Sequence, residues 1–210
     1  VVTTIKSQEE TKHYDLLTGL PTRSLGERLI AEFMKDHNGC LIFLDMDNLK
    51  KINDIHGHKA GDRALKNLGS LLSRYTKEGL SCRLGGDEFL LFLPDVTAES
   101  ASETMTQLFG QFQAIAQADA EIRYASLSAG LCLCTSGDTF ADCCSKADKA
   151  LYYVKQNGKN QFSFYQQISY QSPDSASIAR DLHQIADSLR KSGSYAGALD
   201  LNYRDFSRQY

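Results

Sequence analysis

The sequence predicts one α/β domain that contains an antiparallel element, and three observations carry this prediction. Helical and strand periodicities alternate over about the first 165 residues. The run 40–44 is apolar on both faces and closes on Asp45-Met46-Asp47, as expected for a strand buried at the centre of a sheet. Two short strand patterns flank Gly85-Gly86-Asp87-Glu88, whose glycine pair indicates a hairpin.

The elements of the first half follow from the spacing of apolar residues. A charged helix is predicted up to about residue 14, followed by a turn over 15–21. The next helix, 22–35, has Leu25, Leu29 and Phe33 on its predicted inner face. After the buried strand, two helices are predicted over 49–55 and 60–75.

The second half predicts strands over 81–84 and 89–93, a helix over 98–116, a strand over 124–134, a helix over 139–156 and a last strand over 162–165. We therefore divide the chain into a linker helix (1–14) that continues an upstream region, the main domain (15–165) and an extension (166–210). The extension is predicted to be an αα-hairpin. Its apolar stripe needs cover from this domain, a second copy or a partner, and consists of Ile178, Leu182, Ile185 and Leu189.

The composition of the chain argues against several classes of function. With 42% hydrophobic and 23% charged residues, the chain is an ordinary globular protein. A formal net charge of −3 supplies no field that would draw it onto nucleic acid. No apolar run approaches the roughly 20 residues that a membrane helix needs. The sequence therefore predicts neither a nucleic-acid partner nor a membrane span.

The spacing of the cysteines and the first residue of the sequence lead to expectations about the cellular compartment and about the extent of the chain. The six cysteines match neither zinc pairs nor a secreted disulfide framework, so we expect a reducing cytoplasm and thiols that act as small buried hydrophobes. Strand alternation places Cys132 and Cys134 on one face. The chain begins with Val1, so we expect a fragment, including the option that it is the cytoplasmic part of a larger sensor.

Two pairs of acidic residues are candidates for a metal-binding site. Period-two alternation directs Asp45 and Asp47 to the same side, and Asp87-Glu88 lies at the tip of the predicted hairpin. Carboxylates brought together repel one another unless cations neutralise them, so a shared cluster implies hard metal ions such as Mg²⁺. The alternative is that these carboxylates are helix caps and hairpin-tip charges.

Six motifs in one order carry a family resemblance. The chain resembles the GGDEF family of diguanylate cyclases over about residues 13–165. The motifs are Asp15-Leu-Leu-Thr18-Gly-Leu-Pro21, Phe43-Leu-Asp45-Met-Asp47, Lys51-Ile-Asn53-Asp54, Gly57-His58-Lys-Ala-Gly61-Asp62, Arg83-Leu-Gly85-Gly86-Asp87-Glu88-Phe89 and Ala147-Asp148-Lys-Ala150-Leu151-Tyr152.

The resemblance implies a palm-like nucleotidyl cyclase fold, with a central, mostly antiparallel sheet surrounded by helices. It also implies condensation of two GTP into cyclic di-GMP by a homodimer in which each subunit holds one GTP. Asp45, the Met46 carbonyl and Asp87 would bind two Mg²⁺ or Mn²⁺ ions, with Glu88 beside them in an acid/base role. Two alternatives stay open for deprotonating the attacking hydroxyl: Asp87 as the base, or activation by the metal itself.

The resemblance also assigns the substrate contacts. Asn53 and Asp62 match the positions that recognise guanine, and His58 lies in the same loop, where a capping or core role is the alternative. The segment Asn48-Leu49-Lys50 opens a helix whose amides face phosphate, and Lys50 would steady the transition state. Lys155 and Lys159 match distal phosphate contacts, although without the resemblance both would be solvated charges.

Other interpretations remain open. The Arg-x-x-Asp motif of the family's product-inhibition site is replaced by Thr76-Lys77-Glu78-Gly79, so we expect weak product inhibition. The chain could instead be a catalytically inactive GGDEF module that binds GTP or a protein partner for regulation. A third reading makes it an interaction module whose residues 166–210 bind a partner.

Overall fold

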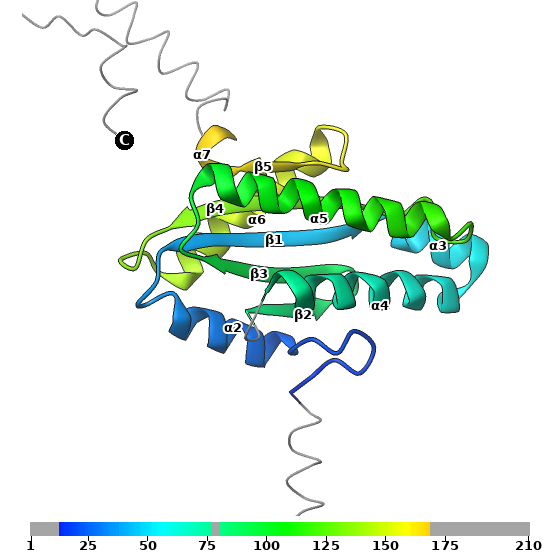
Figure 1. The fold of residues 1–210 in the computed structure, drawn as a ribbon, viewed down its shortest axis with the longest axis horizontal. Coiled ribbons are helices and arrows are strands. Elements are labelled where there is room, and N and C mark those ends of the chain that lie inside the picture. The colour runs from blue at the N-terminus through cyan, green and yellow to red at the C-terminus, as the bar shows by residue number, and fades with distance from the viewer. Residues whose placement is uncertain (1–12, 77–79, 169–210) are drawn as a thin grey trace, which may run out of the picture. The chain divides into compact units, whose positions relative to one another are not determined.

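A computed structural model describes residues 13–76 and 80–168 (Figure 1). Five strands form one sheet in the order β2-β3-β1-β4-β5. Neighbours are antiparallel except β4 and β5, which are parallel. The predicted α/β fold with a mostly antiparallel sheet surrounded by helices is therefore confirmed.

The sequence periodicities place most elements within a few residues of their observed bounds. The helices are α2 (Arg23–Phe33), α3 (Leu49–His56), α4 (His58–Tyr75), α5 (Ala98–Ala118), α6 (Phe140–Gln156) and α7 (Tyr165–Ile168). The strands are β1 (Gly39–Asp47), β2 (Ser81–Gly85), β3 (Glu88–Pro94), β4 (Ser126–Cys134) and β5 (Phe162–Phe164).

The sheet separates two layers of apolar packing. On one face, residues of β1 such as Ile42 and Leu44 pack with α4 and α5. On the other face, Leu41 packs with Ile30 of α2 and with Ala147 of α6. Because side chains alternate along a strand, β1 serves both layers, which explains why its sequence is apolar on both faces.

Three local predictions need correction. Leu29 does not belong to the inner face of α2: it is 37% exposed, while Ile30 and Met34 are buried. Leu25 is buried and Phe33 packs against the core as predicted, so only Leu29 is misplaced. The side of α2 that carries Ile30 and Met34 packs on β2 and β3. Tyr14 forms a bridge with Pro21 and is not helical. Tyr165 begins α7 instead of ending the last strand.

Several predictions fall outside the described residues. These are the linker helix over 1–12, the αα-hairpin over 169–210 and the substituted product-inhibition segment 77–79. The compact unit that contains the sheet extends to Ile168. The helical extension therefore stays a prediction.

Gly130 determines how closely α6 approaches the sheet. A Cβ atom at Gly130 would lie 2.1 Å from the Ala147 carbonyl oxygen and 2.1 Å from the Leu151 nitrogen, both backbone atoms of α6. We expect Gly130→Ala to lower the free energy of unfolding by about 3 kcal/mol or more, because backbone cannot yield as a flexible side chain does. Chemical denaturation measures this effect.

Gly110 supplies the matched control for that substitution. It lies in α5 with no atom within 4 Å of the added Cβ, so Gly110→Ala should stabilise the domain by about 0.5–1 kcal/mol. Equal effects of the two substitutions would show that the contact between β4 and α6 does not require glycine.

Candidate active site

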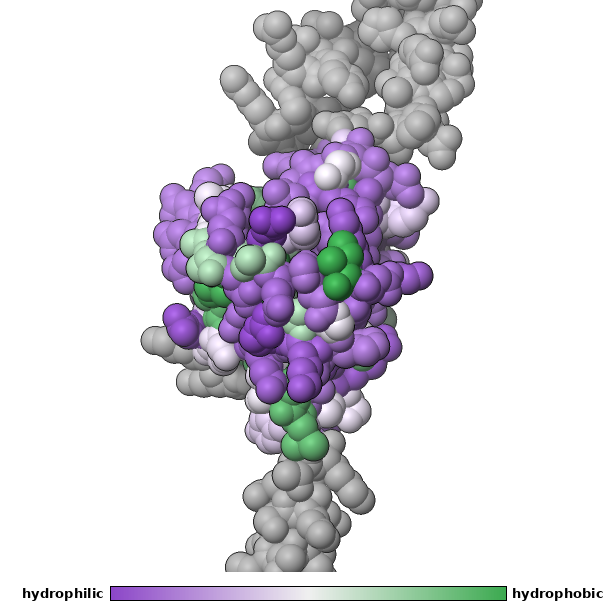
Figure 2. Space-filling view, turned by 90° about the vertical axis from the view of Figure 1, so that its right-hand side faces the viewer, coloured by the Kyte–Doolittle hydropathy of each residue, from purple (hydrophilic) through white to green (hydrophobic). Residues whose placement is uncertain are grey.

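The expected site residues gather where β1 ends, at the right-hand end of the sheet in Figure 1. β1 is central, so Asp45 is opposite Glu88 of β3 on one side and Ser128 of β4 on the other. Seen from this end, the surface is mostly hydrophilic, with a few separate hydrophobic patches (Figure 2). A groove of about 470 Å³ opens there, lined by Asp45, Met46, Asp47, Asn48, Leu49, Lys50, Lys51, Asp54, Asp87, Lys155 and Lys159.

Asp45 is a buried carboxylate among charges of both signs. Burial raises the pKa of Asp45, the Lys155 hydrogen bond lowers it, and the neighbouring charges of Asp87 and Asp47 raise it; the net shift is upward. Lys155 Nζ lies 2.7 Å from Asp45 Oδ2. Lys155 therefore approaches the carboxylate, whereas the resemblance had assigned it to a phosphate.

Asp47 has a different environment, which the sequence did not reveal. Its carboxylate accepts hydrogen bonds from the Ser126 hydroxyl at 2.9 Å, from the Ser128 hydroxyl at 2.8 Å and from the Asn160 backbone N–H at 3.3 Å. It caps no helix, since no side chain caps α3. These bonds join β1 to β4 and to the loop before β5, so Asp47 fixes the end of the strand that carries Asp45.

The glycine hairpin is held by Arg83 of β2. The guanidinium Nε and Nη2 donate to the Gly86 carbonyl at 3.2 and 2.7 Å, and Nη1 donates to Asp15 at 3.0 and 3.2 Å. Gly86 has a φ of 54°, a conformation that glycine adopts without steric cost. The turn that begins at Asp15 therefore positions the hairpin that carries Asp87, and this connects the first motif with the fifth.

Asp15 provides a prediction with a defined pH dependence. Burial by itself raises the pKa of Asp15, but hydrogen bonds from Thr18 and Arg83 outweigh it and hold the pKa below its ordinary value. A carboxyl of depressed folded pKa stabilises the protein above its unfolded value of about 3.9, and this contribution disappears as the pH falls through the folded pKa. We expect Asp15→Asn to lower the free energy of unfolding by about 1–3 kcal/mol at pH 7, and this difference should shrink below about pH 4.

Denaturant titrations of both proteins across this pH range measure the difference. The control is Asp36→Asn, which removes an exposed carboxylate beyond the end of α2 and should change stability by less than about 0.5 kcal/mol. A deficit of Asp15→Asn that stays constant down to low pH would show that the charge of Asp15 is not what stabilises the turn.

The four other expected residues do not line the groove. Glu88 is exposed at the start of β3. Asn53 of α3 packs against Gly61 of α4, where an added Cβ would lie 2.0 Å from Asn53 Oδ1. That oxygen is buried without a hydrogen-bond partner. Asp62 and His58 are exposed on the first turns of α4, which excludes a core role for His58.

The start of α3 is shaped by Asn48. This residue has a φ of 66°, a strained value outside glycine, and its side-chain amide donates to the Tyr124 carbonyl at 2.9 Å. No side chain caps the helix that follows, and its first residues, including Lys50 and Lys51, line the groove. Such an end favours an anionic ligand.

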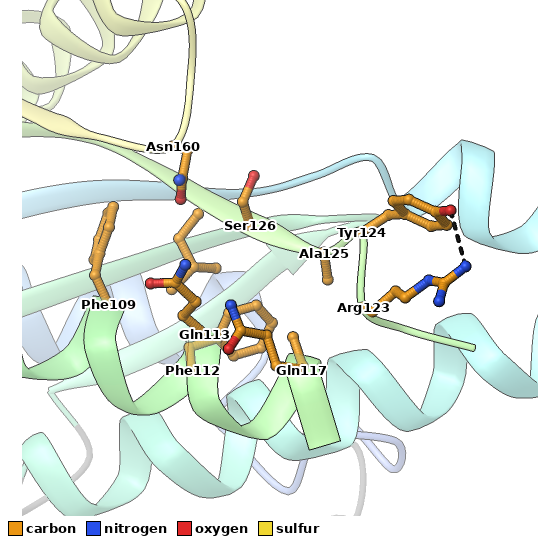
Figure 3. Close-up of a pocket in the computed structure, with 11 residues that line it drawn as sticks. Phe109, Phe112, Gln113, Gln117, Arg123, Tyr124, Ala125, Ser126 and Asn160 are labelled. Atoms are coloured by element: carbon orange, nitrogen blue, oxygen red, sulfur yellow. Dashed lines mark hydrogen bonds between the residues drawn. The ribbon is translucent and has the colours of Figure 1, made fainter. Parts of the chain in front are cut away.

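A second, smaller cavity of about 140 Å³ lies between α5 and β4 (Figure 3). Phe109, Gln113 and Gln117 reach it from α5, and Ser126 and Asn160 reach it from the opposite side. Ser126 and Asn160 also donate hydrogen bonds to Asp47, which lines the groove, so these bonds link the wall of the cavity to the wall of the groove.

A groove with buried carboxylates, facing lysines and an open helix end offers ligands for a cation and for a phosphorylated molecule. The family model described as "Diguanylate cyclase, GGDEF domain" matches residues 12–161. The chain belongs to the GGDEF family.

Curated relatives and solved structures agree with this assignment. The chain is similar to the probable diguanylate cyclase DgcE of Escherichia coli, with 33% identity over 161 residues, 73% of this chain and 15% of the relative. It is similar to diguanylate cyclase TpbB of Pseudomonas aeruginosa, with 33% identity over 156 residues, 70% of this chain and 36% of the relative. The chain thus spans well under half the length of both relatives.

The solved GGDEF domain of TpbB from Pseudomonas aeruginosa superimposes with a TM-score of 0.62 at 30% identity, covering 70% of this chain and 97% of that one. The GGDEF domain of DgcB from Caulobacter crescentus, solved with c-di-GMP, has a TM-score of 0.66 at 23% identity, covering 73% of this chain and 96% of that one. The second likeness concerns the fold alone.

Among the described residues, no helix is long and apolar enough to cross a bilayer.

Proposed function

We propose that this domain is a diguanylate cyclase that condenses two GTP into cyclic di-GMP with Mg²⁺ or Mn²⁺. The observation that carries the proposal is that Asp45 and Asp87 line one groove with Lys50, Lys155 and Lys159. Carboxylates there can hold cations, and the lysines can hold phosphates.

The donor set of the groove fits hard divalent ions. Asp45, the Met46 carbonyl and Asp87 offer the oxygen ligands that Mg²⁺ prefers. Asp45 is buried beside two other carboxylates, so its ionised form needs a cation. In this structure the Lys155 ammonium supplies that charge. When bound, two ions would polarise the α-phosphate and lower the pKa of the attacking hydroxyl.

The nucleotide would lie along the groove toward α3 and α4. The unpaired Asn53 Oδ1 and the carboxylate of Asp62 are acceptors, and guanine presents a ring N–H and an amino group as donors. His58 lies one turn before Asp62 on α4. The N–H groups of Asn48, Leu49 and Lys50 would bind phosphate, together with the side chains of Lys50, Lys155 and Lys159.

The reaction requires two copies of the domain. Each copy holds one GTP, and the 3′-hydroxyl of each attacks the α-phosphate of the other, which forms two phosphodiester bonds and releases two pyrophosphates. Either Asp87 would accept the hydroxyl proton as a base, or the metal ions would acidify the hydroxyl directly. Glu88, the next residue along the chain, would assist as an acid or base. The homodimer therefore completes the site.

Incubation of the purified chain with GTP and Mg²⁺, followed by chromatography, tests the proposal. Cyclic di-GMP should appear, and the rate per enzyme should rise with protein concentration through the dimerisation range. A rate strictly proportional to protein concentration would argue against two half-sites. GTP binding without any product would instead identify a catalytically inactive GGDEF module.

A further inference from the structure

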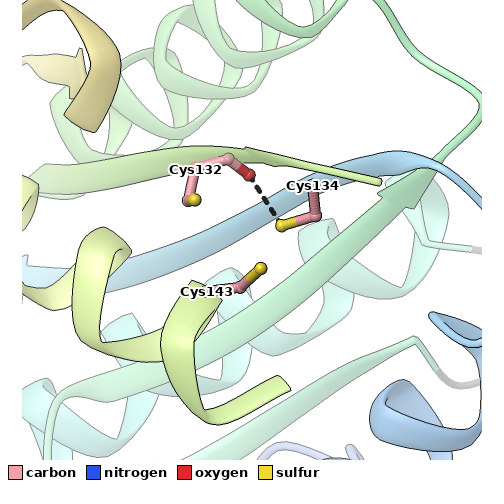
Figure 4. Close-up of side chains that lie close together, drawn as sticks. All are labelled: Cys132, Cys134 and Cys143. Atoms are coloured by element: carbon pink, nitrogen blue, oxygen red, sulfur yellow. Dashed lines mark hydrogen bonds between the residues drawn. The ribbon is translucent and has the colours of Figure 1, made fainter. Parts of the chain in front are cut away.

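Three cysteine thiols converge at the end of the domain opposite the groove (Figure 4). Cys132 and Cys134 project from β4 toward α6, and Cys143 projects from α6 toward them. The three sulfur atoms lie within 4.8 Å of one another, and all three residues are buried. The strand alternation noted in the sequence brings two of them together, but the third comes from a helix.

The α6-facing side of β4 explains why the cluster forms there. Along this side the strand presents Ser128 toward the groove, then Gly130, then Cys132 and Cys134. Gly130 lets α6 approach so closely that the first turns of the helix reach the end of the strand. Cys143 therefore lies over the two strand cysteines as a consequence of the packing between β4 and α6.

A disulfide does not account for this arrangement. Residues two apart on a strand have Cα atoms about 6.6–6.8 Å apart, at the upper limit for bridging. A bond from Cys143 to either strand cysteine would still leave one thiol over. In the reduced state Cys134 donates weakly to the Cys132 carbonyl at 3.2 Å, and Cys132 donates to the Leu133 carbonyl at 3.5 Å.

The surroundings favour thiolate at Cys132 alone. The hydrogen bond with Cys132 and burial raise the pKa of Cys134, so this thiol needs a metal ion to lose its proton. Cys143 is the fourth residue of α6, inside the positive end of the helix, and Lys146 follows one turn later. The Cys134 hydrogen bond lowers the pKa of Cys132, burial opposes this, and the charge of Lys146 lowers it further. Burial raises the pKa of Cys143 to about 11, so this thiol needs a metal ion to lose its proton at neutral pH. The nearby Asp138 opposes thiolate formation.

We propose that Cys132, Cys134 and Cys143 form a trithiolate site for a soft metal ion, with Zn²⁺ as the physiological candidate. Thiolates select soft ions over Mg²⁺. A Zn–S distance of about 2.3 Å corresponds to sulfur atoms about 3.8 Å apart in a tetrahedron, so the three sulfurs need to close by no more than about 1 Å. The fourth position would hold an exogenous ligand, and Cys134, at the end of β4, is the least buried and marks the entry side.

Such an ion would tie the start of α6 to β4. Lys155, which contacts Asp45, lies twelve residues further along the same helix, or about 18 Å at 1.5 Å per residue. The site is therefore separate from the carboxylate groove, and the inference does not rest on the proposed function.

Titration of the reduced full chain with Cd²⁺, in excess Mg²⁺ to occupy the carboxylate groove, tests this site. Cd²⁺ bound by thiolates gives an ultraviolet charge-transfer absorption that carboxylate ligation does not. We expect one equivalent per chain, competition by Zn²⁺, and a higher melting temperature with Zn²⁺. Cys143→Ala should remove all three effects. The matched control is Cys144→Ala, the adjacent half-buried thiol, which should retain them.

The cluster is a packing feature alone if the reduced wild-type chain shows no thiolate absorption, or if Cys143→Ala keeps it. Circular dichroism checks that each variant is folded. Should Cys143→Ala fail to fold, Cys134→Ser at the less buried position serves in its place. Loss of one thiolate ligand there must reduce the charge-transfer intensity or the affinity for Zn²⁺ at least tenfold.

Discussion

Asp45→Asn is expected to abolish cyclic di-GMP formation while leaving the domain folded. The amide keeps the size of the side chain but cannot neutralise a cation. Metal ions supply several kcal/mol of transition-state stabilisation in this type of reaction, so losing a ligand should reduce turnover by at least about a thousandfold. Product chromatography with GTP and Mg²⁺ measures the loss.

Although Asp45→Asn should be inactive, we expect its stability to be maintained or increased. Burial raises the pKa of Asp45 despite the Lys155 hydrogen bond, so the metal-free fold disfavours the ionised carboxyl. Asparagine removes that buried charge, and Lys155, whose side chain is 35% exposed, can turn to solvent. Denaturation in a chelator should therefore show Asp45→Asn to be at least as stable as wild type.

Two further variants test whether the loss of activity is specific to the carboxylates of the groove. Asp36→Asn, at the opposite end of β1, should leave both activity and stability nearly unchanged. Asp87→Ala removes the half-buried carboxylate of the hairpin and should be equally inactive. Near wild-type turnover in Asp45→Asn or Asp87→Ala would exclude the carboxylate groove as the catalytic site.

Asp62→Ala is expected to weaken GTP binding about ten- to a hundredfold, while ATP binding changes by less than about twofold. A hydrogen bond to a charged acceptor contributes about 1.5–3 kcal/mol, which corresponds to this range. Adenine lacks the pair of donors that guanine offers, so it has nothing to lose at this position. Displacement of a fluorescent nucleotide by GTP and by ATP gives both affinities.

Asn53 offers a second test of guanine recognition. Its buried Oδ1 fits only because Gly61 has no Cβ, so Gly61→Ala should displace the Asn53 amide and also weaken GTP binding. Glu103→Ala, which removes an exposed carboxylate from α5, is the control for Asp62→Ala. If Asp62→Ala weakens GTP and ATP equally, Asp62 acts through general charge and does not recognise the base.

Much of the fold could be predicted because its signals are local. The period-two pattern of β1 is a property of the strand backbone, so it places Asp45 and Asp47 on one side whatever lies next to them. The glycine pair likewise indicates a hairpin from a few residues. Leu29 is the exception on α2, because Leu29 and Ile30 are both apolar and only the packing of the helix against β2 and β3 decides which of them is buried.

The sequence by itself determined the order of the elements, the pair of carboxylates at the end of the central strand and, through six motifs, the family. Only the tertiary structure decided what each carboxylate contacts: Lys155 approaches Asp45, whereas two serines and Asn160 hold Asp47. It also brought Cys143 to the two strand cysteines. These partners lie far apart in the chain. Their meeting depends on the register of β1 against β4 and on the close approach of α6 at Gly130, and no local periodicity encodes either.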